Sequence, residues 1–328
     1  MANVICISHS QDVDGLVCAT LLKMAKHANY VLADYSELLS QTRRITGGVD
    51  ELYLCDLGLQ DSIAEDLMRI SKFARITYID HHPLSDEVLQ TLKELGVKIV
   101  HSVETCAGAL AYQLFRRELA EEASLLAAYA VLSDYPSADR DLPFSVKLEP
   151  QMVLFESALL SYAIARACDD SEFKKHVVES LSQLEYPHNI ENVVSLATQQ
   201  LQYIMDLIKN TDKNVSYSNN VAYVQVLGST GIVANALVHS LEKPLVVCYR
   251  EFENGAFYYL SVRTKDPRYD LGSLASTIAK RLKGSGGGHP MAAAAQLPKE
   301  SFSKFIELID ESIEGSSEQQ NAADQVEA

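Results

Sequence analysis

The feature that most limits the fold of this chain is the alternation of short apolar runs with helical periodicity over its first third. Apolar runs that favour strands recur at residues 4–8, 30–33, 52–55, 76–79 and 98–100. Between them, residues 16–26, 61–72 and 85–95 carry apolar side chains at a spacing of three to four, which is typical of helices. Strands that alternate with helices form parallel sheets. We therefore predict an α/β fold with a doubly wound parallel sheet in the N-terminal domain.

The rest of the chain shows two further patterns. From residue 105 to about residue 210 the periodicity is almost entirely helical, and from about residue 215 strand and helix patterns alternate again. A chain of 328 residues also exceeds the roughly 250 residues at which single cores stop growing. We predict an N-terminal domain over 1–185, a connecting helix over 186–212, a smaller α/β domain over 213–314 and a polar, disordered tail over 315–328. The functional cleft is expected between the two domains.

The charge of the chain limits its partners. A formal net charge of −16 argues against salt-driven binding to long nucleic acids, which needs many cationic contacts to phosphates. Residues 263–283 nevertheless carry six basic and two acidic side chains, so an anionic ligand can be held locally. The six cysteines include no C-x-x-C pair and are predicted to be reduced core residues. With no long apolar segment, the chain is expected to be cytoplasmic, without a membrane partner.

Acidic residues and histidines follow several predicted strands at the ends where such sheets bind ligands. Each has an ordinary structural explanation when taken alone, since aspartates often cap helices or end turns. Asp80, His81 and His82 in succession are harder to explain in that way. The residues predicted to converge are His9, Asp12, Asp14, Asp56, His81 and Asp134.

This set contains four carboxylates and two imidazoles. Crowding that many carboxylates without a cation would raise their pKa values until some became neutral. Two divalent metal ions would remove the conflict. Mixed carboxylate and imidazole ligation favours Mn²⁺, with Mg²⁺ or Co²⁺ as alternatives, over Ca²⁺ or a structural Zn²⁺ site.

A run of glycines follows the helix predicted over residues 271–282. It reads Gly284-Ser285-Gly286-Gly287-Gly288-His289-Pro290. We expect Gly284 to cap the helix. A cap needs one glycine, so four glycines in five positions followed by a histidine predict backbone N–H groups that closely approach an anion.

The Asp80-His81-His82 triplet, together with the other metal-binding motifs in order, resembles the DHH phosphoesterase superfamily. The glycine run with His289-Pro290-Met291-Ala292-Ala293 resembles the nucleic-acid-binding motif of the DHH-associated C-terminal domain. Two details differ from the common family pattern. The first motif reads His-x-x-Asp-x-Asp-Gly from His9, and Ala294 stands where relatives usually have glycine.

The resemblance implies a role for each of these residues. One metal would be held by His9, Asp12 and Asp56, and the second by Asp14, Asp56, His81 and Asp134. A water bridging the metals would attack phosphorus, with Asp80, His81 and His82 as the catalytic triplet: Asp80 orients an imidazole and His82 faces the phosphate. Arg263, Gly286, Gly287, Gly288 and His289 would bind substrate. Residues 1–185 would then be the catalytic domain and 213–314 the substrate-binding domain.

The short, acidic chain is most similar in organisation to the nanoRNases. The resemblance therefore implies a manganese-dependent phosphodiesterase for short oligonucleotides or small linear or cyclic nucleotides, and it leaves a homodimer open. A RecJ-like exonuclease specific for single strands is one alternative. A non-catalytic nucleotide-binding or replication-scaffold protein is the second, although the complete set of metal ligands speaks against it.

Overall fold

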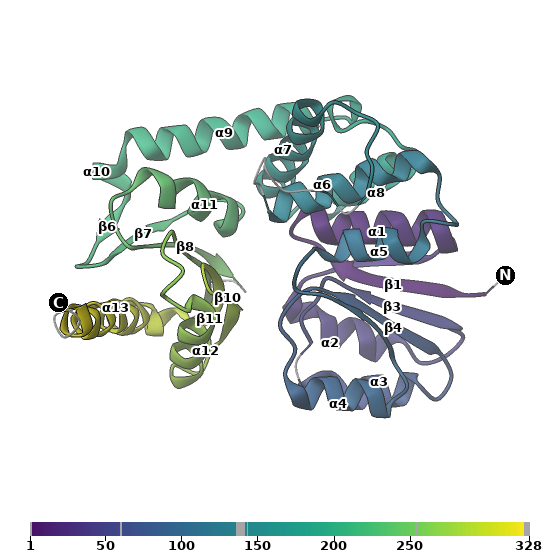
Figure 1. The fold of residues 1–328 in the computed structure, drawn as a ribbon, viewed down its shortest axis with the longest axis horizontal. Helices are drawn as coiled ribbons and strands as arrows, with labels where there is room; N and C mark the ends of the chain where they lie inside the picture. Colours follow the sequence, from purple (N-terminus) through teal and green to yellow (C-terminus); the bar gives the residue numbers. More distant parts are fainter. Residues whose placement is uncertain (1, 60, 136–141, 143, 253–254, 325–328) are drawn as a thin grey trace. The chain divides into compact units, whose positions relative to one another are not determined.

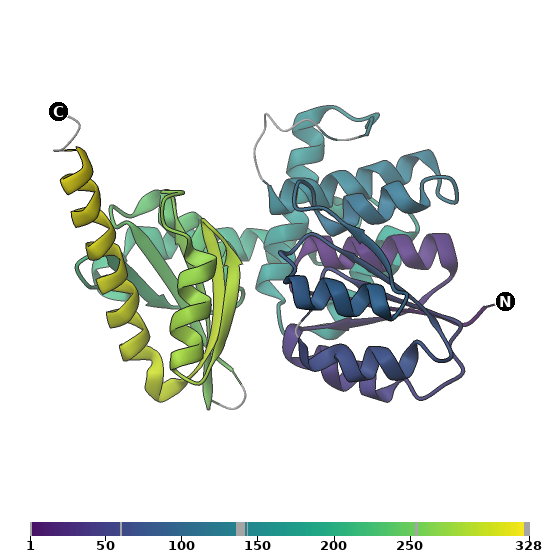
Figure 2. The ribbon, with the colours of Figure 1, turned by 60° about the horizontal axis from the view of Figure 1, so that its bottom comes forward.

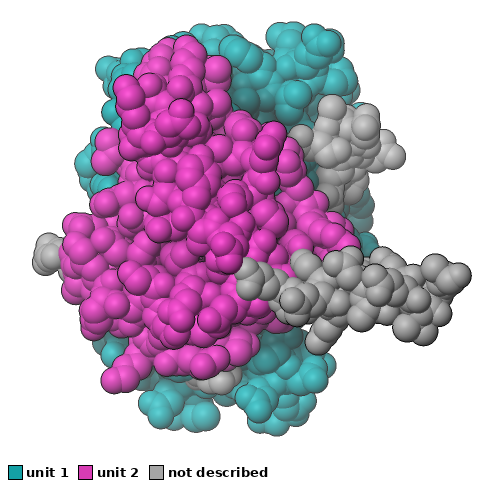
Figure 3. Space-filling model, turned by 90° about the vertical axis from the view of Figure 1, so that its left-hand side faces the viewer, with its two compact units in different colours: residues 1–200 teal, residues 201–328 magenta. Residues whose placement is uncertain are grey.

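The computed structural model describes the chain except for residues 1, 60, 136–141, 143, 253–254 and 325–328. The chain divides into two compact units, residues 1–200 and 201–328, which Figure 3 shows in different colours. Helix α9 (Val193–Lys209) continues across this division. The connecting region predicted over 186–212 contains a short 3₁₀ turn (Pro187–Asn189), α9 and the beginning of α10 (Thr211–Asn214).

The first unit contains the predicted parallel sheet. Its strands are β1 (Val4–His9), β2 (Asn29–Ala33), β3 (Glu51–Cys55), β4 (Arg75–Asp80) and β5 (Lys98–His101). They lie in the order β2-β1-β3-β4-β5, and every neighbouring pair is parallel. All five predicted strands are confirmed, with boundaries that shift by one residue or so.

Side chains on these strands alternate between two buried faces, as the pleat requires. Cys6 and Tyr53 belong to the core that helices α1 (Val13–Lys26) and α5 (Ala107–Phe115) cover. Ile7 and Leu54 belong to the core on the other face, which is covered by α2 (Tyr35–Arg44), α3 (Ala64–Ile70) and α4 (Asp86–Glu94) (Figure 1). Burial on both faces explains why the strands read as apolar runs without polar alternation.

Helices cover both faces of this sheet and extend the first core. They are α1 (Val13–Lys26), α2 (Tyr35–Arg44), α3 (Ala64–Ile70), α4 (Asp86–Glu94), α5 (Ala107–Phe115), α6 (Ser124–Asp134), α7 (Pro150–Arg166) and α8 (Ser171–Ser182), with short 3₁₀ turns at Asp61–Ile63 and Glu121–Ala123. The sequence did not predict α2. Only Leu38 and Thr42 are fully buried in it, so its apolar periodicity is weak.

The second unit is built on a mixed sheet in the order β10-β11-β9-β8-β7-β6. The strands are β6 (Ser216–Tyr217), β7 (Val221–Gln225), β8 (Leu245–Phe252), β9 (Phe257–Thr264), β10 (Ser285–His289) and β11 (Ala292–Pro298). Helix α11 (Thr230–Ser240) contacts β8 and β9, and α12 (Leu271–Arg281) contacts β10 and β11. Figure 2 shows α12 beside these strands. The hairpin turn predicted at 253–255 falls largely on residues 253–254, outside the described residues.

The glycine run differs from the prediction because it forms an edge strand. Glycine disfavours strands, but β10 lies against α12, where side chains would not fit. A Cβ on Gly288 would lie 2.4 Å from the carbonyl oxygen of Ala292, and one on Gly272 of α12 would lie 2.3 Å from that of Gly288. The cap also differs, since Lys283, not Gly284, takes the left-handed conformation after α12 (φ 60°).

The last helix is longer than predicted. After a 3₁₀ turn (Lys299–Ser301), α13 runs from Phe302 to Asp324 and includes most of the segment 315–328 that was expected to be disordered. Its buried residues Phe305, Ile309 and Ile313 anchor the helix on the core. A helix that is already nucleated extends readily through Glu, Gln and Ala, which have high helix propensity.

The structure also bears on the cysteines and on membrane insertion. All six cysteines are free and buried, as predicted. Among the residues described, no helix is long and apolar enough to cross a membrane.

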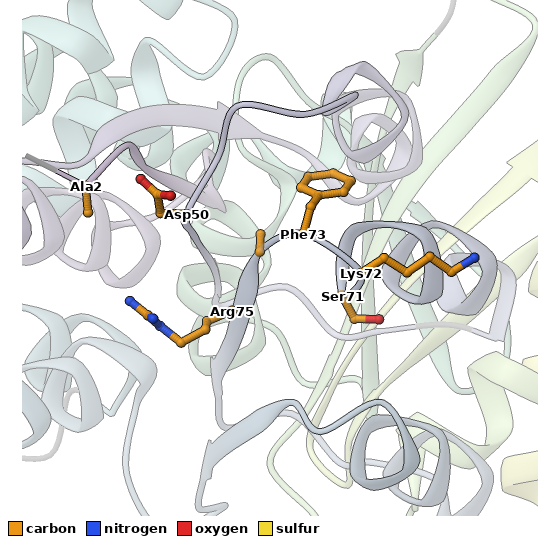
Figure 4. A pocket seen from close by; sticks show the side chains of 7 residues that line it. Ala2, Asp50, Ser71, Lys72, Phe73 and Arg75 are labelled. Atoms are coloured by element: carbon orange, nitrogen blue, oxygen red, sulfur yellow. The ribbon is translucent and has the colours of Figure 1, made fainter.

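An open hollow of about 650 Å³ lies at the edge of the first unit's sheet where strands begin (Figure 4). Asp50 directly precedes β3, and Arg75 is the first residue of β4. The hollow is lined by Ala2, Asp50, Ser71, Lys72, Phe73, Ala74 and Arg75. It is therefore at the edge opposite to the one where the predicted site residues lie.

Candidate metal centre

The strand order of the first unit brings the predicted residues together. β1 has β2 on one side and β3 on the other, so the strand order reverses at β1. Sheets of this kind bind ligands at such a switch point, beyond the carboxyl ends of the strands. The register pairs Ser8 with Cys55 and Cys55 with Ile79. His9, Asp56 and Asp80, each one residue further along, therefore lie side by side at this switch point.

Three carboxylates converge on one nitrogen of His81. Nε2 of His81 lies 3.4 Å from Oδ1 of Asp56, 3.5 Å from Oδ2 of Asp134 and 3.8 Å from Oδ2 of Asp14. These side chains come from the ends of β3, β4 and α6 and from the first turn of α1. The ligand atoms of Asp14, His81 and Asp134 lie within 4.8 Å of one another, which is close enough to share one cation.

His9 and Asp12 lie beside this cluster as a pair of their own, with Nε2 of His9 3.5 Å from Oδ2 of Asp12. Asp12 is also the N-cap of α1, because its Oδ1 accepts a hydrogen bond from the amide of Gly15 at 3.0 Å. The capping explanation is therefore correct for one oxygen of Asp12, while the second oxygen faces the imidazole.

Asp14 is held by the beginning of α5, which sequence reasoning missed. Its Oδ2 accepts a hydrogen bond from the amide of Ala107 at 2.8 Å, and its Oδ1 accepts one from the amide of Gly108 at 2.6 Å. A Cβ on Gly108 would lie 2.8 Å from that Oδ1. Glycine at this position therefore lets the helix terminus approach the carboxylate closely. The only sequence signal was a small residue at the beginning of a helix.

Asp80 organises the second histidine. Its Oδ1 accepts hydrogen bonds from Nδ1 of His82 and from the backbone N–H of His81, both at 2.8 Å, and Tyr78 donates to its Oδ2. Burial alone would raise the pKa of Asp80, but the charge of His82 and these side-chain hydrogen bonds outweigh burial and lower it. Asp80 is thus a fully buried, ionised anchor for His82.

Two tyrosines at the site were not predicted. The hydroxyl of Tyr135, next to Asp134, lies 3.3 Å from Nδ1 of His81, and that of Tyr35 lies 3.0 Å from Nε2 of His82. Tyr135 could have been noticed from its position beside Asp134. Tyr35 had no such signal, because the helix it begins was not predicted.

The electrostatics of the cluster favour a bound cation. Burial, and then the charges of Asp12, Asp14 and Asp134, raise the pKa of Asp56 well above its usual value. Burial and the nearby Asp12 likewise raise the pKa of Asp14, against the opposing effect of His81. Burial lowers the pKa of His81, which favours the neutral imidazole that a metal needs.

The backbone of Asp56 and two unpartnered side-chain atoms also fit a site for a cation. Asp56 is 1% exposed and adopts a left-handed backbone (φ 56°), an unusual conformation outside glycine that is often found at functional sites. Its Oδ2 and Nδ1 of His9 are buried without a hydrogen-bond partner among the described residues. Such orphaned atoms fit ligands of divalent cations, and the carboxylate and imidazole donors suit Mn²⁺ and similar ions.

The second unit presents a different set of groups on one face of its sheet. His289 pairs with Ala292, and Ala292 pairs with Arg263, across three adjacent strands. Residues directly opposite each other point to the same face, so Arg263 and His289 share a face. Gly287, opposite Ala294, is on that face too, and a Cβ there would meet nothing within 4 Å. Gly286 and Gly288 are on the other face, towards α12.

Arg263 is held in place by neutral acceptors. Its Nε donates to Oδ1 of Asn235 in α11 at 2.6 Å, and its Nη1 donates to the carbonyl oxygens of Val262 and Ala293. All the acceptors found for it among the described residues are uncharged, and burial lowers its pKa. A Cβ on Gly231, in the first turn of α11, would lie 3.2 Å from Nη2. A guanidinium beside a helix N-terminus is suited to an anion.

Comparison with known proteins gives one family match and several similar structures. Residues 218–315 match the DHHA1 domain family. No curated protein sequence matches the chain. One similar structure is described as the DHH domain of a member of the s1p family of ribosomal proteins, with a TM-score of 0.70, 14% identity and coverage of 95% of this chain and 86% of that one.

Two further similar structures have printed activities or ligands. The pGpG-specific phosphodiesterase PggH from Vibrio cholerae matches with a TM-score of 0.55 and 12% identity, over 95% of this chain and 99% of that one. RecJ from Thermus thermophilus, in complex with Mn²⁺, matches with a TM-score of 0.57 and 14% identity, over 94% of this chain and 51% of the RecJ chain. At these identities, the likeness establishes the fold.

Proposed function

Because the chain combines the fold of the DHH phosphoesterases with a C-terminal DHHA1 domain, as its sequence resemblance implied, we propose that it is a two-metal phosphodiesterase. Its proposed substrates are short oligonucleotides or small linear or cyclic nucleotides, and Mn²⁺ is the proposed metal. The observation that carries the proposal is the convergence of Asp14, Asp56 and Asp134 on Nε2 of His81.

The proposed metal ligands divide into two sets that share Asp56. His9 and Asp12 would hold one ion with Asp56, and Asp14, His81 and Asp134 would hold the second. Two divalent cations supply charge to neutralise a phosphate and to lower the pKa of water. The backbone amides of α5 and the hydroxyl of Tyr135 would keep Asp14 and His81 in orientation, as outer partners of metal ligands do.

His82 is the group proposed to contact the reacting phosphate. Burial alone would lower its pKa, but Asp80 outweighs burial and raises the pKa above its usual value. A protonated imidazole with Nδ1 hydrogen-bonded to Asp80 can donate a hydrogen bond from Nε2 to a phosphate oxygen. Since this donor is already oriented, little reorganisation is needed as charge develops in the transition state.

The preference for short substrates follows from charge. Arg263 and His289 offer a compact anion site on one face of the second unit's sheet, whereas the chain as a whole carries a net charge of −16. Only the first phosphates of a strand would therefore meet cationic partners, and further nucleotides would gain little. The description of the similar PggH structure as pGpG-specific supports a small-nucleotide substrate as the proposal for this chain.

A RecJ-like exonuclease is the second candidate, favoured by the match over 94% of this chain. The chain spans about half of the RecJ chain that it matches, and its own charge disfavours a long single strand. A scaffold without catalysis is the third, and the buried, unpartnered oxygen of Asp56 speaks against it, because a protein without metals would bury that carboxylate at a cost.

The deciding experiment measures hydrolysis of end-labelled oligonucleotides from two to about thirty nucleotides, with a cyclic dinucleotide alongside, in the presence of Mn²⁺. We expect kcat/KM to be highest for the shortest substrates and to fall steeply with length. Processive degradation of the long strands would instead assign the RecJ-like activity. Tight nucleotide binding without hydrolysis in Mn²⁺, Mg²⁺ or Co²⁺ would instead support the non-catalytic scaffold protein.

A further inference from the structure

The ring of Tyr35 lies between the two histidines at the edge of the metal centre. Its centroid is 4.8 Å from that of His9, and its hydroxyl oxygen is 3.0 Å from Nε2 of His82. The side chain is also partly open to solvent, with an exposed fraction of 36% for the residue. Tyr35 is thus the residue that joins the His9 side of the centre to the His82 side.

The local sequence fixes this position. β2 pairs with β1 so that Ala33 lies opposite His9, and two residues later the chain begins α2. Asp34 caps that helix, and the backbone amide of Asp34 donates a hydrogen bond to Oε2 of Glu37 at 3.0 Å. Such a capping box holds the first helical residue, Tyr35, in a defined orientation.

The imidazole of His82 is consequently held at both nitrogens. Nδ1 lies 2.8 Å from Oδ1 of Asp80, and Nε2 lies 3.0 Å from the hydroxyl of Tyr35. Gly58 lies beside both rings, because a Cβ there would be in ordinary contact with them, 3.6 Å from Cβ of His82 and 3.8 Å from Cε1 of Tyr35. Asp80 fixes one edge of the ring, and Tyr35 fixes the edge that faces away from Asp80.

We propose that Tyr35 is the positioning residue for His82. Its hydroxyl holds the ring in the orientation in which Nε2 faces a substrate phosphate oxygen, and a three-centre hydrogen bond lets the Nε2–H keep this contact while it donates to that oxygen. This inference rests on the proposed function and deepens it, because it names a residue outside the metal ligands on which the reactivity of His82 depends. Tyr35 is a positioning residue since it acts through His82.

The kinetic test uses Tyr35→Phe, which keeps the ring beside His9 and removes only the hydroxyl. With a dinucleotide substrate and saturating Mn²⁺, we expect kcat to fall about tenfold, the worth of one hydrogen bond to a charged group, with little change in KM. Tyr186→Phe, a similarly exposed tyrosine of the same unit at 41%, is the control and should keep full activity.

A double-mutant experiment distinguishes positioning of His82 from a general structural effect of Tyr35→Phe. In the His82→Gln background, Tyr35→Phe should cause no further loss, because its effect passes through His82. If the two losses instead multiply independently, or if Tyr35→Phe alone retains the wild-type kcat, the inference is overturned.

A spectroscopic test separates this inference from the proposed function. In metal-free protein labelled with ¹⁵N at histidine, Tyr35→Phe should shift the Nε2 resonance of His82, assigned by its absence in His82→Gln, and leave that of His188 unchanged. An unchanged His82 signal overturns the inference even if the protein is an active phosphodiesterase. A shifted signal in a protein that hydrolyses none of the substrates upholds the contact, and the proposed function alone fails.

Discussion

The two units gather groups of opposite charge on sheets of different construction. The first unit gathers aspartates at the ends of parallel strands, where burial and mutual repulsion raise the pKa values of Asp14 and Asp56. The second unit gathers Arg263, His289 and an unobstructed glycine on one face of a mixed sheet. The first collection is suited to cations, and the second is suited to an anion.

The difference also concerns how each site is supported. In the first unit, side chains are held by other side chains and by the amides of α5, so the centre is already shaped before a ligand binds. In the second unit, the contribution is largely backbone and open surface, with Arg263 held by Asn235. Changes in the first unit should therefore affect turnover, whereas changes in the second should affect substrate binding.

The largest expected effect is that of Asp56→Asn. Loss of outer partners of metal ligands alone costs about 10–100-fold, so removal of the shared ligand should reduce kcat by more than about a hundredfold. Asp66→Asn is the control, because Asp66 is also buried but pairs with Arg69 at 2.8 Å in α3. Both variants are assayed with a dinucleotide and Mn²⁺. Near-normal turnover by Asp56→Asn would refute the two-metal assignment.

The second prediction concerns the pH dependence of stability without metal. The pKa of Asp56 in the folded protein is raised well above its usual value of 3.8, mainly by burial. Between the unfolded and folded values the native state holds the extra proton, so this group's contribution makes stability fall as pH rises. In EDTA, the melting temperature of the wild type should fall relative to that of Asp56→Asn as the pH rises from the usual value of 3.8 through the raised pKa of Asp56 in the folded protein.

Added Mn²⁺ provides the check on this pH prediction. Binding to the folded state stabilises it by mass action, and ionised carboxylates bind better. Calorimetry should therefore show that Mn²⁺ raises the melting temperature of the wild type more at high pH than at low pH. Asp56→Asn should lose most of that increase. If the difference in melting temperature between the wild type and Asp56→Asn in EDTA does not change with pH, the pKa of Asp56 is not raised.

The sequence was sufficient to predict that these acidic residues and histidines cluster at one edge of the sheet, because its signals are local. Each of the residues Asp56, Asp80 and His81 directly follows or ends an apolar run, and strand order then brings them together. The contacts that support Asp14 are not local. Gly108 is 94 residues from Asp14, and its amide can be matched to that carboxylate only in the folded chain.

The second unit was harder to predict for a related reason. The glycine run has no intrinsic preference for a strand, and β10 forms because it pairs with β11 and packs against α12. Gly286, Gly287 and Gly288 were therefore all expected to bind the ligand. The register divides them instead, since Gly288 accommodates a positive φ and a close backbone contact, and Gly287 has open space.

In the second unit, the larger effect should come from Arg263→Lys. Lysine keeps the charge but cannot reproduce the fixed geometry of the bonds to Asn235 and the two carbonyl oxygens. We expect KM for a dinucleotide to rise about tenfold, with a smaller change in kcat. Arg268→Lys is the control, because Arg268 pairs with Asp266 at an exposed position. A fall in kcat without a change in KM would show that Arg263 acts in the chemical step rather than in substrate binding.

Gly287→Ala also tests substrate binding by the second unit, with a smaller expected effect on KM. A Cβ there meets nothing within 4 Å, so the melting temperature should stay the same while KM rises by about threefold to tenfold if a ligand lies against this backbone. Gly288→Ala should lower the melting temperature, since its Cβ would lie 2.4 Å from the carbonyl oxygen of Ala292. An unchanged KM in Gly287→Ala would show that the ligand does not lie against β10.

The smallest effect is expected at the hollow in Figure 4, where Arg75→Ala tests the choice of sheet edge. Arg75 is exposed and pairs with Glu51 at 2.6 Å, and such surface pairs contribute little to stability. Turnover of a dinucleotide should stay within about twofold of the wild type. The lining of the hollow contains the cationic Lys72 and Arg75 as well as the acidic Asp50, so this variant tests whether an anion binds there. A large rise in KM would show that substrate also binds at the edge where strands begin, and the contrast between one cation-binding and one anion-binding unit would then no longer hold.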